Sequence, residues 1–175
     1  MESVFKMKNS WIASLAFFFV SCAAEKEVEY LQTLSFTVAE NEVKVGMNQL
    51  GNILLMLPLD SILKVNKSDI TRLNKMVLTE ATLIANDSNL TNKYVTEFRL
   101  DMAGDLYNNQ PGKPFTLASS KEITSKTELK PTKIDISEMY SGKAIFLLPV
   151  GTFTQSQPKP FSMKLILKWK MKLGQ

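Results

Sequence analysis

Residues 161–173 read Phe-Ser-Met-Lys-Leu-Ile-Leu-Lys-Trp-Lys-Met-Lys-Leu, and this stretch decides the fold. Every odd-numbered position is apolar, and every even-numbered position except Ile166 is serine or lysine. Alternation with a period of two is typical of a β-strand that buries one face. A helix would instead spread the lysines around its whole circumference. The stretch therefore predicts one long, half-buried strand.

The rest of the chain repeats this pattern in shorter pieces. Residues 34–38 and 43–45 predict a hairpin around a turn at 40–42, and the apolar or alternating runs 53–57, 62–65, 76–84, 94–102 and 144–150 predict further strands. One helical turn is expected at 68–75, and 104–120 is expected to be a long irregular stretch. About eight or nine short strands favour an all-β, antiparallel β-sandwich, Ig-like or jelly-roll-like, as a single domain over 30–175. A closed β-barrel is the alternative fold.

The N-terminal segment has the order of a secretory signal. Lys6 and Lys8 precede an apolar run over residues 11–21, which is far shorter than the roughly 20 residues of a spanning helix. The only cysteine of the chain, Cys22, follows directly.

Phe19-Val20-Ser21-Cys22 resembles the signal of bacterial lipoproteins, in which a small residue precedes an invariant cysteine. Phe19 stands where that family usually has leucine. The resemblance implies removal of residues 1–21, acylation of Cys22, and a lipidated N-terminus and tether over 22–29. An ordinary signal peptide cleaved near Ser21 or Ala23, leaving a free thiol, is the alternative.

The resemblance also bears on location. Ala23-Ala24 lacks the aspartate that favours inner-membrane retention, which suggests the outer membrane, in either its periplasmic or its surface leaflet. Glu25-Lys26-Glu27 resembles the charged stretch that exports lipoproteins to the surface in Bacteroidetes, and a solvated tether is its simpler interpretation.

Composition narrows the possible chemistry. The chain has 175 residues, no histidine and a net charge of +4. Without histidine it lacks the commonest general base and the commonest transition-metal ligand. We therefore expect a non-enzymatic protein without cofactor or metal.

Lys164, Lys168, Lys170 and Lys172 share one face of the last predicted strand and form a lysine stripe. An anionic partner such as lipid headgroups, acidic glycan or an acidic protein face is one interpretation. We favour the other, a soluble outer face whose lysines discourage pairing at a sheet edge. Nucleic acid is not expected as a partner, because Trp169 lies on the opposite face and cannot stack on bases beside the lysines.

The 104–120 stretch offers weaker candidates. Asp101, Asp105, Asn108 and Asn109 carry oxygen ligands of the type calcium uses, but turn chemistry is the favoured interpretation. Tyr94, Tyr107, Phe115 and Tyr140 could stack on sugar rings, and packing under the long loop is favoured instead.

These features together predict a membrane-anchored accessory subunit that binds an envelope protein partner. The alternative is a surface-exposed glycan-binding or adhesin module. A hydrophobe carrier is a further possibility, which would require a hollow barrel.

Overall fold

The structure is a computed structural model that describes residues 25–39, 42–85, 94–106, 110–111, 114–140, 145–157 and 159–174. For residues 105, 106, 110, 111 and 140 it describes the backbone alone. The strands are β1 (Lys26–Val38), β2 (Gly46–Gln49), β3 (Ile53–Leu54), β4 (Leu73–Ala85), β5 (Val95–Leu106), β6 (Gln110–Pro111), β7 (Phe115–Ser120), β8 (Lys126–Pro131), β9 (Ile145–Phe153) and β10 (Phe161–Leu173). The helices are α1 (Leu59–Val65), η1 (Ile70–Arg72) and η2 (Ser137–Tyr140).

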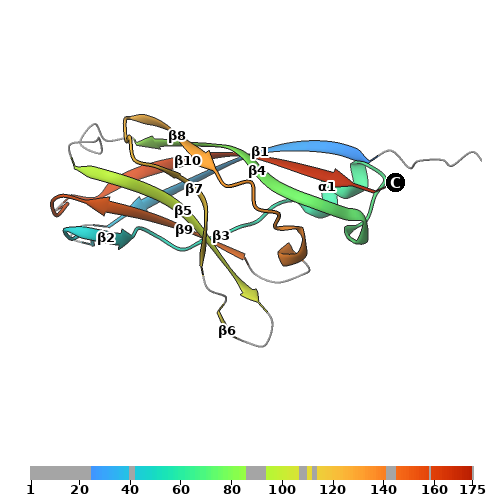
Figure 1. The fold of residues 1–175 in the computed structure, drawn as a ribbon, viewed down its shortest axis with the longest axis horizontal. Helices are drawn as coiled ribbons and strands as arrows, with labels where there is room; N and C mark the ends of the chain where they lie inside the picture. Colours follow the sequence, from blue (N-terminus) through green and yellow to red (C-terminus); the bar gives the residue numbers. More distant parts are fainter. Residues whose placement is uncertain are drawn as a thin grey trace, which may run out of the picture.

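The strands form one continuous antiparallel sheet in the order β1-β10-β4-β8-β7-β5-β9-β2, with β3 on β9 and β6 on β5. The sheet curls, so that the half with β1, β10 and β4 crosses the half with β5, β9 and β2 at an angle (Figure 1). Strand β8 joins the halves because its residues 126–129 pair with β4 and its last two residues pair with β7. The prediction of an all-β, antiparallel single domain is confirmed, although one curled sheet replaces the two separate sheets of a sandwich.

The core fills the space between the two halves. All seven odd-numbered residues of β10 are buried, so the alternation that predicted this strand is confirmed with its bounds. Trp169, Phe98 and Phe153 are the largest fully buried side chains among the described residues. This apolar core among the described residues disfavours the hollow barrel that a hydrophobe carrier would require, and the carrier stays a prediction.

The predicted hairpin over 34–45 is wrong. Strand β1 pairs with β10 over its whole length, from Lys26 opposite Leu173 to Val38 opposite Phe161. Val43 forms only an isolated bridge, with Gln157. Pairing with β10 lets the inward side chains of a 13-residue strand join the core, which a two- or three-residue return strand could not do.

Other boundaries also differ. The run 62–65 belongs to helix α1 rather than to a strand, and only Ile53–Leu54 of the run 53–57 is a strand. Residues 26–29, expected in the tether, already belong to β1. The stretch 104–120, expected to be irregular, contains the end of β5, β6 and β7.

Candidate functional site

The lysine stripe lies in the interior of the sheet rather than at its edge. Strand β10 is flanked by β1 on one side and by β4 on the other. The edge-protection interpretation of these lysines is therefore wrong. Their side chains are half-buried and point away from the core, because the odd-numbered residues between them take the inward face.

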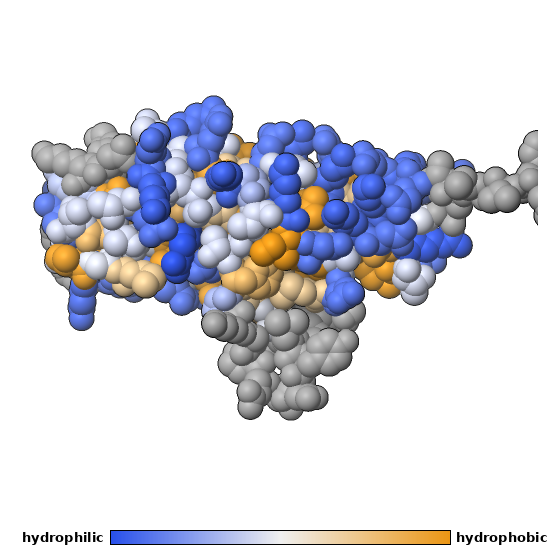
Figure 2. Space-filling model, viewed as in Figure 1, coloured by the Kyte–Doolittle hydropathy of each residue, from blue (hydrophilic) through white to orange (hydrophobic). Residues whose placement is uncertain are grey.

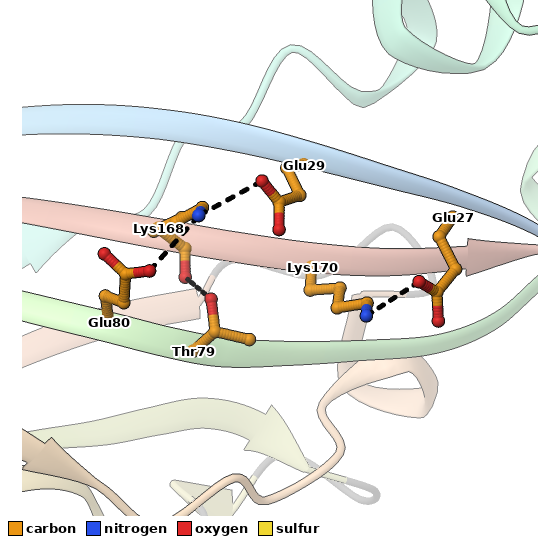
Figure 3. A network of polar contacts seen from close by, with 6 residues as sticks. All are labelled: Glu27, Glu29, Thr79, Glu80, Lys168 and Lys170. Carbon is orange, nitrogen blue, oxygen red and sulfur yellow. Dashed lines mark hydrogen bonds and ion pairs between the residues drawn. The ribbon is translucent and has the colours of Figure 1, made fainter.

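Three of the four lysines are paired with glutamates of the neighbouring strands. Lys168 Nζ lies 3.1 Å from Glu29 Oε2 on β1 and 3.1 Å from Glu80 Oε1 on β4. Lys170 Nζ lies 2.7 Å from Glu27 Oε2 (Figure 3). Lys172 Nζ lies 3.2 Å from Glu25 Oε2 and 3.9 Å from Glu27 Oε1. We call this set of three lysines and four glutamates the charge ladder.

Hydrogen bonding within the ladder shifts several pKa values in the directions that keep it charged. The hydrogen bond from Lys172, and then that from Asn74, lowers the pKa of Glu25 below its ordinary 4.5. The hydrogen bond from Lys170 lowers the pKa of Glu27. Hydrogen bonds to Glu29 and Glu80 raise the pKa of Lys168 above 10.5. Most of the stripe is thus neutralised by the protein itself.

Lys164 differs from the other three. It lies between Ser35 of β1 and Ile84 of β4, neither of which carries a charge. The structure therefore does not present the four predicted lysines as one continuous cationic surface for an anionic partner. The sequence did hold a signal for the ladder: Glu25, Glu27 and Glu29 recur with the same spacing of two as the lysines.

A β-bulge interrupts the pairing of β10 with β4 beside the ladder. Lys168 faces Glu80 and Trp169 faces Leu78, so Thr79 has no opposing residue. Thr79 Oγ1 donates a hydrogen bond to the carbonyl oxygen of Lys168 at 3.0 Å (Figure 3). Extra residues of this kind bend a strand and re-aim its side chains.

Next to the bulge, an open cleft of about 550 Å³ lies where β8 departs from β4. Its lining includes Glu80, Thr82, Glu128 and Lys130, all of which lie at the surface of the molecule. Clefts of this size can hold small ligands, but binding sites usually combine enclosure with apolar walls. This cleft is open, so it carries no functional assignment.

The buried polar residue Gln32 was missed by sequence reasoning. Its Oε1 accepts a hydrogen bond from Trp169 Nε1 at 3.1 Å, and its Nε2 donates to the carbonyl oxygen of Met56, also at 3.1 Å. Gln32 thus joins two adjacent strands to the segment after β3. The pattern gave no signal for it, because a single glutamine in an alternating strand is equally compatible with an exposed position.

The predicted oxygen-ligand loop is only partly described. Asp101 is 7% exposed and accepts hydrogen bonds from Arg99 Nη2 at 3.1 Å and Thr116 Oγ1 at 2.8 Å. Its carboxylate therefore serves the β5–β7 pairing. Asn108 and Asn109, and the side chain of Asp105, lie outside the described residues. Within the described ranges, no group of three or more acidic or cysteine side chains is placed to hold a metal ion.

The predicted aromatic candidates are similarly divided. Phe115 packs against the core, as the packing interpretation expected. Tyr94 is half-buried in the turn that leads into β5, while Tyr107 and the side chain of Tyr140 lie outside the described residues. The glycan-binding alternative therefore remains a prediction.

Cys22 also lies outside the described residues, which begin at Glu25. Among the helices that the structure describes, none has the length and hydrophobicity to cross a membrane. Comparison of the whole chain with known protein families finds no match, and comparison with curated proteins finds none either.

Proposed function

We propose that the protein is a lipid-anchored lipoprotein of a bacterial outer membrane, with a non-enzymatic structural or binding role. The observation that supports this most directly joins the sequence to the fold. Cys22 stands three residues before Glu25, and Glu25 is bound to the domain through Lys172 and Asn74. Three residues reach at most about 11 Å. A lipid on Cys22 would therefore hold the folded domain directly at the membrane surface.

The charge pattern supports a role as a folded module rather than as an anionic-ligand receptor. The ladder neutralises most of the lysine stripe, so steering of an anionic partner to that face would be weak. The absence of histidine from the chain disfavours the usual acid–base and metal chemistry. An accessory subunit of an envelope complex fits these features.

The first test is the covalent state of Cys22. Intact-mass and peptide analysis of protein extracted from membranes should show a mature chain that begins at Cys22 and carries acyl groups. Cys22→Ser should abolish both the acylation and the processing. A mature chain that begins beyond Cys22, or a free Cys22 thiol in the membrane-extracted protein, would contradict the proposal.

The binding role needs a separate test. Affinity purification of the detergent-solubilised protein under native conditions should recover a stoichiometric envelope protein. A strictly solitary monomer would sink the accessory-subunit assignment while leaving the anchor intact. Protease treatment of intact cells would cleave the protein if it is the surface-exposed module of the alternative.

A further inference from the structure

Several segments of the chain lie close together at the end of the domain where β1 begins. Here the backbone N–H of Gly174 donates to the carbonyl oxygen of Arg72 at 2.8 Å, and Asn74 Nδ2 donates to Glu25 Oε1 at 3.3 Å. These contacts place η1 and the start of β4 beside the first described residue and the end of β10. Helix α1 lies at the same end (Figure 1). We call this region, residues 59–75 with Glu25 and Gly174, the α1–η1 end.

Two large apolar side chains are exposed at the α1–η1 end. Val65, the last residue of α1, is 81% exposed, the highest value among the large exposed apolar side chains, and Ile70 of η1 is 45% exposed. Neither belongs to the core cluster, which α1 joins through Leu59 and Leu63 and contacts through the partly buried Ile62. Figure 2 shows that this end of the molecule is mostly hydrophilic on the face in view.

Cationic side chains outnumber acidic ones in the segment that carries these apolar residues. Lys64, Lys67, Arg72 and Lys75 are all exposed within 59–75, against two acidic residues, Asp60 and Asp69. Asp69 is already engaged, since it caps η1 through the backbone N–H of Thr71 and lies 3.8 Å from Arg72. Residues 59–75 therefore carry a net charge of +2, which Glu25 of the same end reduces to +1.

This combination matches the chemistry of a bilayer surface. Apolar side chains insert at the boundary between headgroups and acyl chains, while Lys and Arg contact anionic headgroups. The end that presents them is also the end within about 11 Å of Cys22.

We propose that the α1–η1 end is a second membrane contact, which rests against a bilayer containing anionic lipid and inserts Val65 and Ile70 at the headgroup boundary. This inference rests on the proposed lipid anchor at Cys22. The second contact would fix the orientation of the domain relative to the membrane. The acyl chains alone would leave the domain free to tilt, whereas two contacts at one end hold β1 and β10 at a defined angle to the membrane.

The test uses the protein extracted from membranes in detergent and reconstituted into vesicles. Because Cys22 is the only cysteine and is blocked when acylated, Val65→Cys introduces a single reactive thiol for a polarity-sensitive fluorophore. Val45→Cys is the matched control, since Val45 is 67% exposed and directly precedes β2 at the other end of the molecule (Figure 1). Both proteins are compared in phosphatidylcholine vesicles with and without phosphatidylglycerol.

The label at Val65 should show a blue-shifted emission and quenching by a lipid-phase quencher, and both effects should grow when phosphatidylglycerol is added. The label at Val45 should keep its aqueous emission in both vesicles. Adding Lys64→Glu and Lys67→Glu should reduce the shift at Val65, whereas Lys126→Glu and Lys130→Glu on β8 should leave it unchanged.

Two outcomes would overturn the inference, and they differ in what they say about the anchor. If the protein stays bound to vesicles while the Val65 label remains aqueous, the anchor stands and the second contact does not exist. If the protein stays in solution and Cys22 itself reacts with the fluorophore, the anchor fails and the inference fails with it.

Discussion

Gln32→Leu should destabilise the protein measurably, because it removes both hydrogen bonds that this side chain makes in the core. Gln32 is 6% exposed, and its two bonds satisfy the indole N–H of Trp169 and the carbonyl oxygen of Met56. Leucine has a similar volume, so the cavity contribution is small. The substitution leaves the buried indole N–H of Trp169 without a partner, and it also removes the donor to the part-buried carbonyl oxygen of Met56.

The expected magnitude follows from those two groups. Each unsatisfied buried polar group costs about 1–3 kcal/mol. The added apolar burial of leucine offsets about 1 kcal/mol of that cost. We therefore expect the free energy of unfolding to fall by about 2 kcal/mol. With an m-value of about 2 kcal/mol/M in urea, the midpoint should fall by about 1 M.

Urea denaturation of the mature protein, followed by far-UV circular dichroism, is the assay. Thr33→Ala is the control, since Thr33 is the exposed neighbour on the opposite face of β1, and its free energy of unfolding should stay within about 0.5 kcal/mol of that of the unsubstituted protein. A double-mutant cycle of Gln32→Leu with Trp169→Phe should show a coupling of about 0.5–3 kcal/mol. A Gln32→Leu midpoint equal to that of Thr33→Ala would refute the assigned role.

Two further predictions concern the ladder and the core. The pKa values of Glu25 and Glu27 are lowered in the folded state, so their stabilising contribution is present above pH 4.5 and is lost as pH falls through the lowered values. Acid unfolding followed by circular dichroism should show this loss. The loss should be larger at low salt than at high salt, because salt screens the ion pairs. The raised pKa of Lys168 acts at the other end of the scale, where its contribution is present below pH 10.5 and is lost as pH rises through the raised value. Gly151→Ala should lower the thermal midpoint at a cost of about 1–3 kcal/mol, because the new Cβ would lie 2.6 Å from Cε2 of a buried phenylalanine ring, whereas Gly51→Ala, with its nearest atom at 3.9 Å, should be tolerated.

The sequence was sufficient for β10 because one face of that strand is entirely buried and the other entirely outward. Under those conditions the local period of two carries all the information needed, and the bounds 161–173 follow. The lysines on its outward face were predictable in the same way. Their glutamate partners were harder to predict, because β1 pairs with β10 across more than 120 residues of sequence.

The errors occurred where local pattern was ambiguous. A four-residue run such as 62–65, with three apolar residues and one lysine, fits a short strand and one turn of helix equally well, and the structure has it in α1. The strand predicted over 144–150 ends before Gly151, whereas β9 includes Gly151 and continues to Phe153. Gly151 is accommodated there because the ring of Phe153 and the side chain of Leu50 occupy the space that a larger residue would need.

The ion pairs and the glutamine hydrogen bond of β1 lie on opposite faces of the β1–β10 strand pair, and together they fix its register. On the outer face, Glu27 and Glu29 bind successive lysines of β10. On the inner face, Gln32 binds Trp169. A slip of one residue would exchange the two faces. A slip of two would keep the faces but would draw Gln32 away from Trp169, leaving buried groups unsatisfied at about 1–3 kcal/mol each.

Register matters here because β1 directly follows the proposed anchor. Its pairing sets Lys26 opposite Leu173, the last residue of β10. That pairing determines which end of the curled sheet lies within reach of Cys22, and it brings α1 and η1 to the same end through the contacts of Arg72 and Asn74. If the protein is anchored as proposed, its orientation on the membrane is therefore a consequence of β1 register. A variant that loosens this register, such as Gln32→Leu, should broaden the emission of a fluorescent label at Val65 before the domain unfolds.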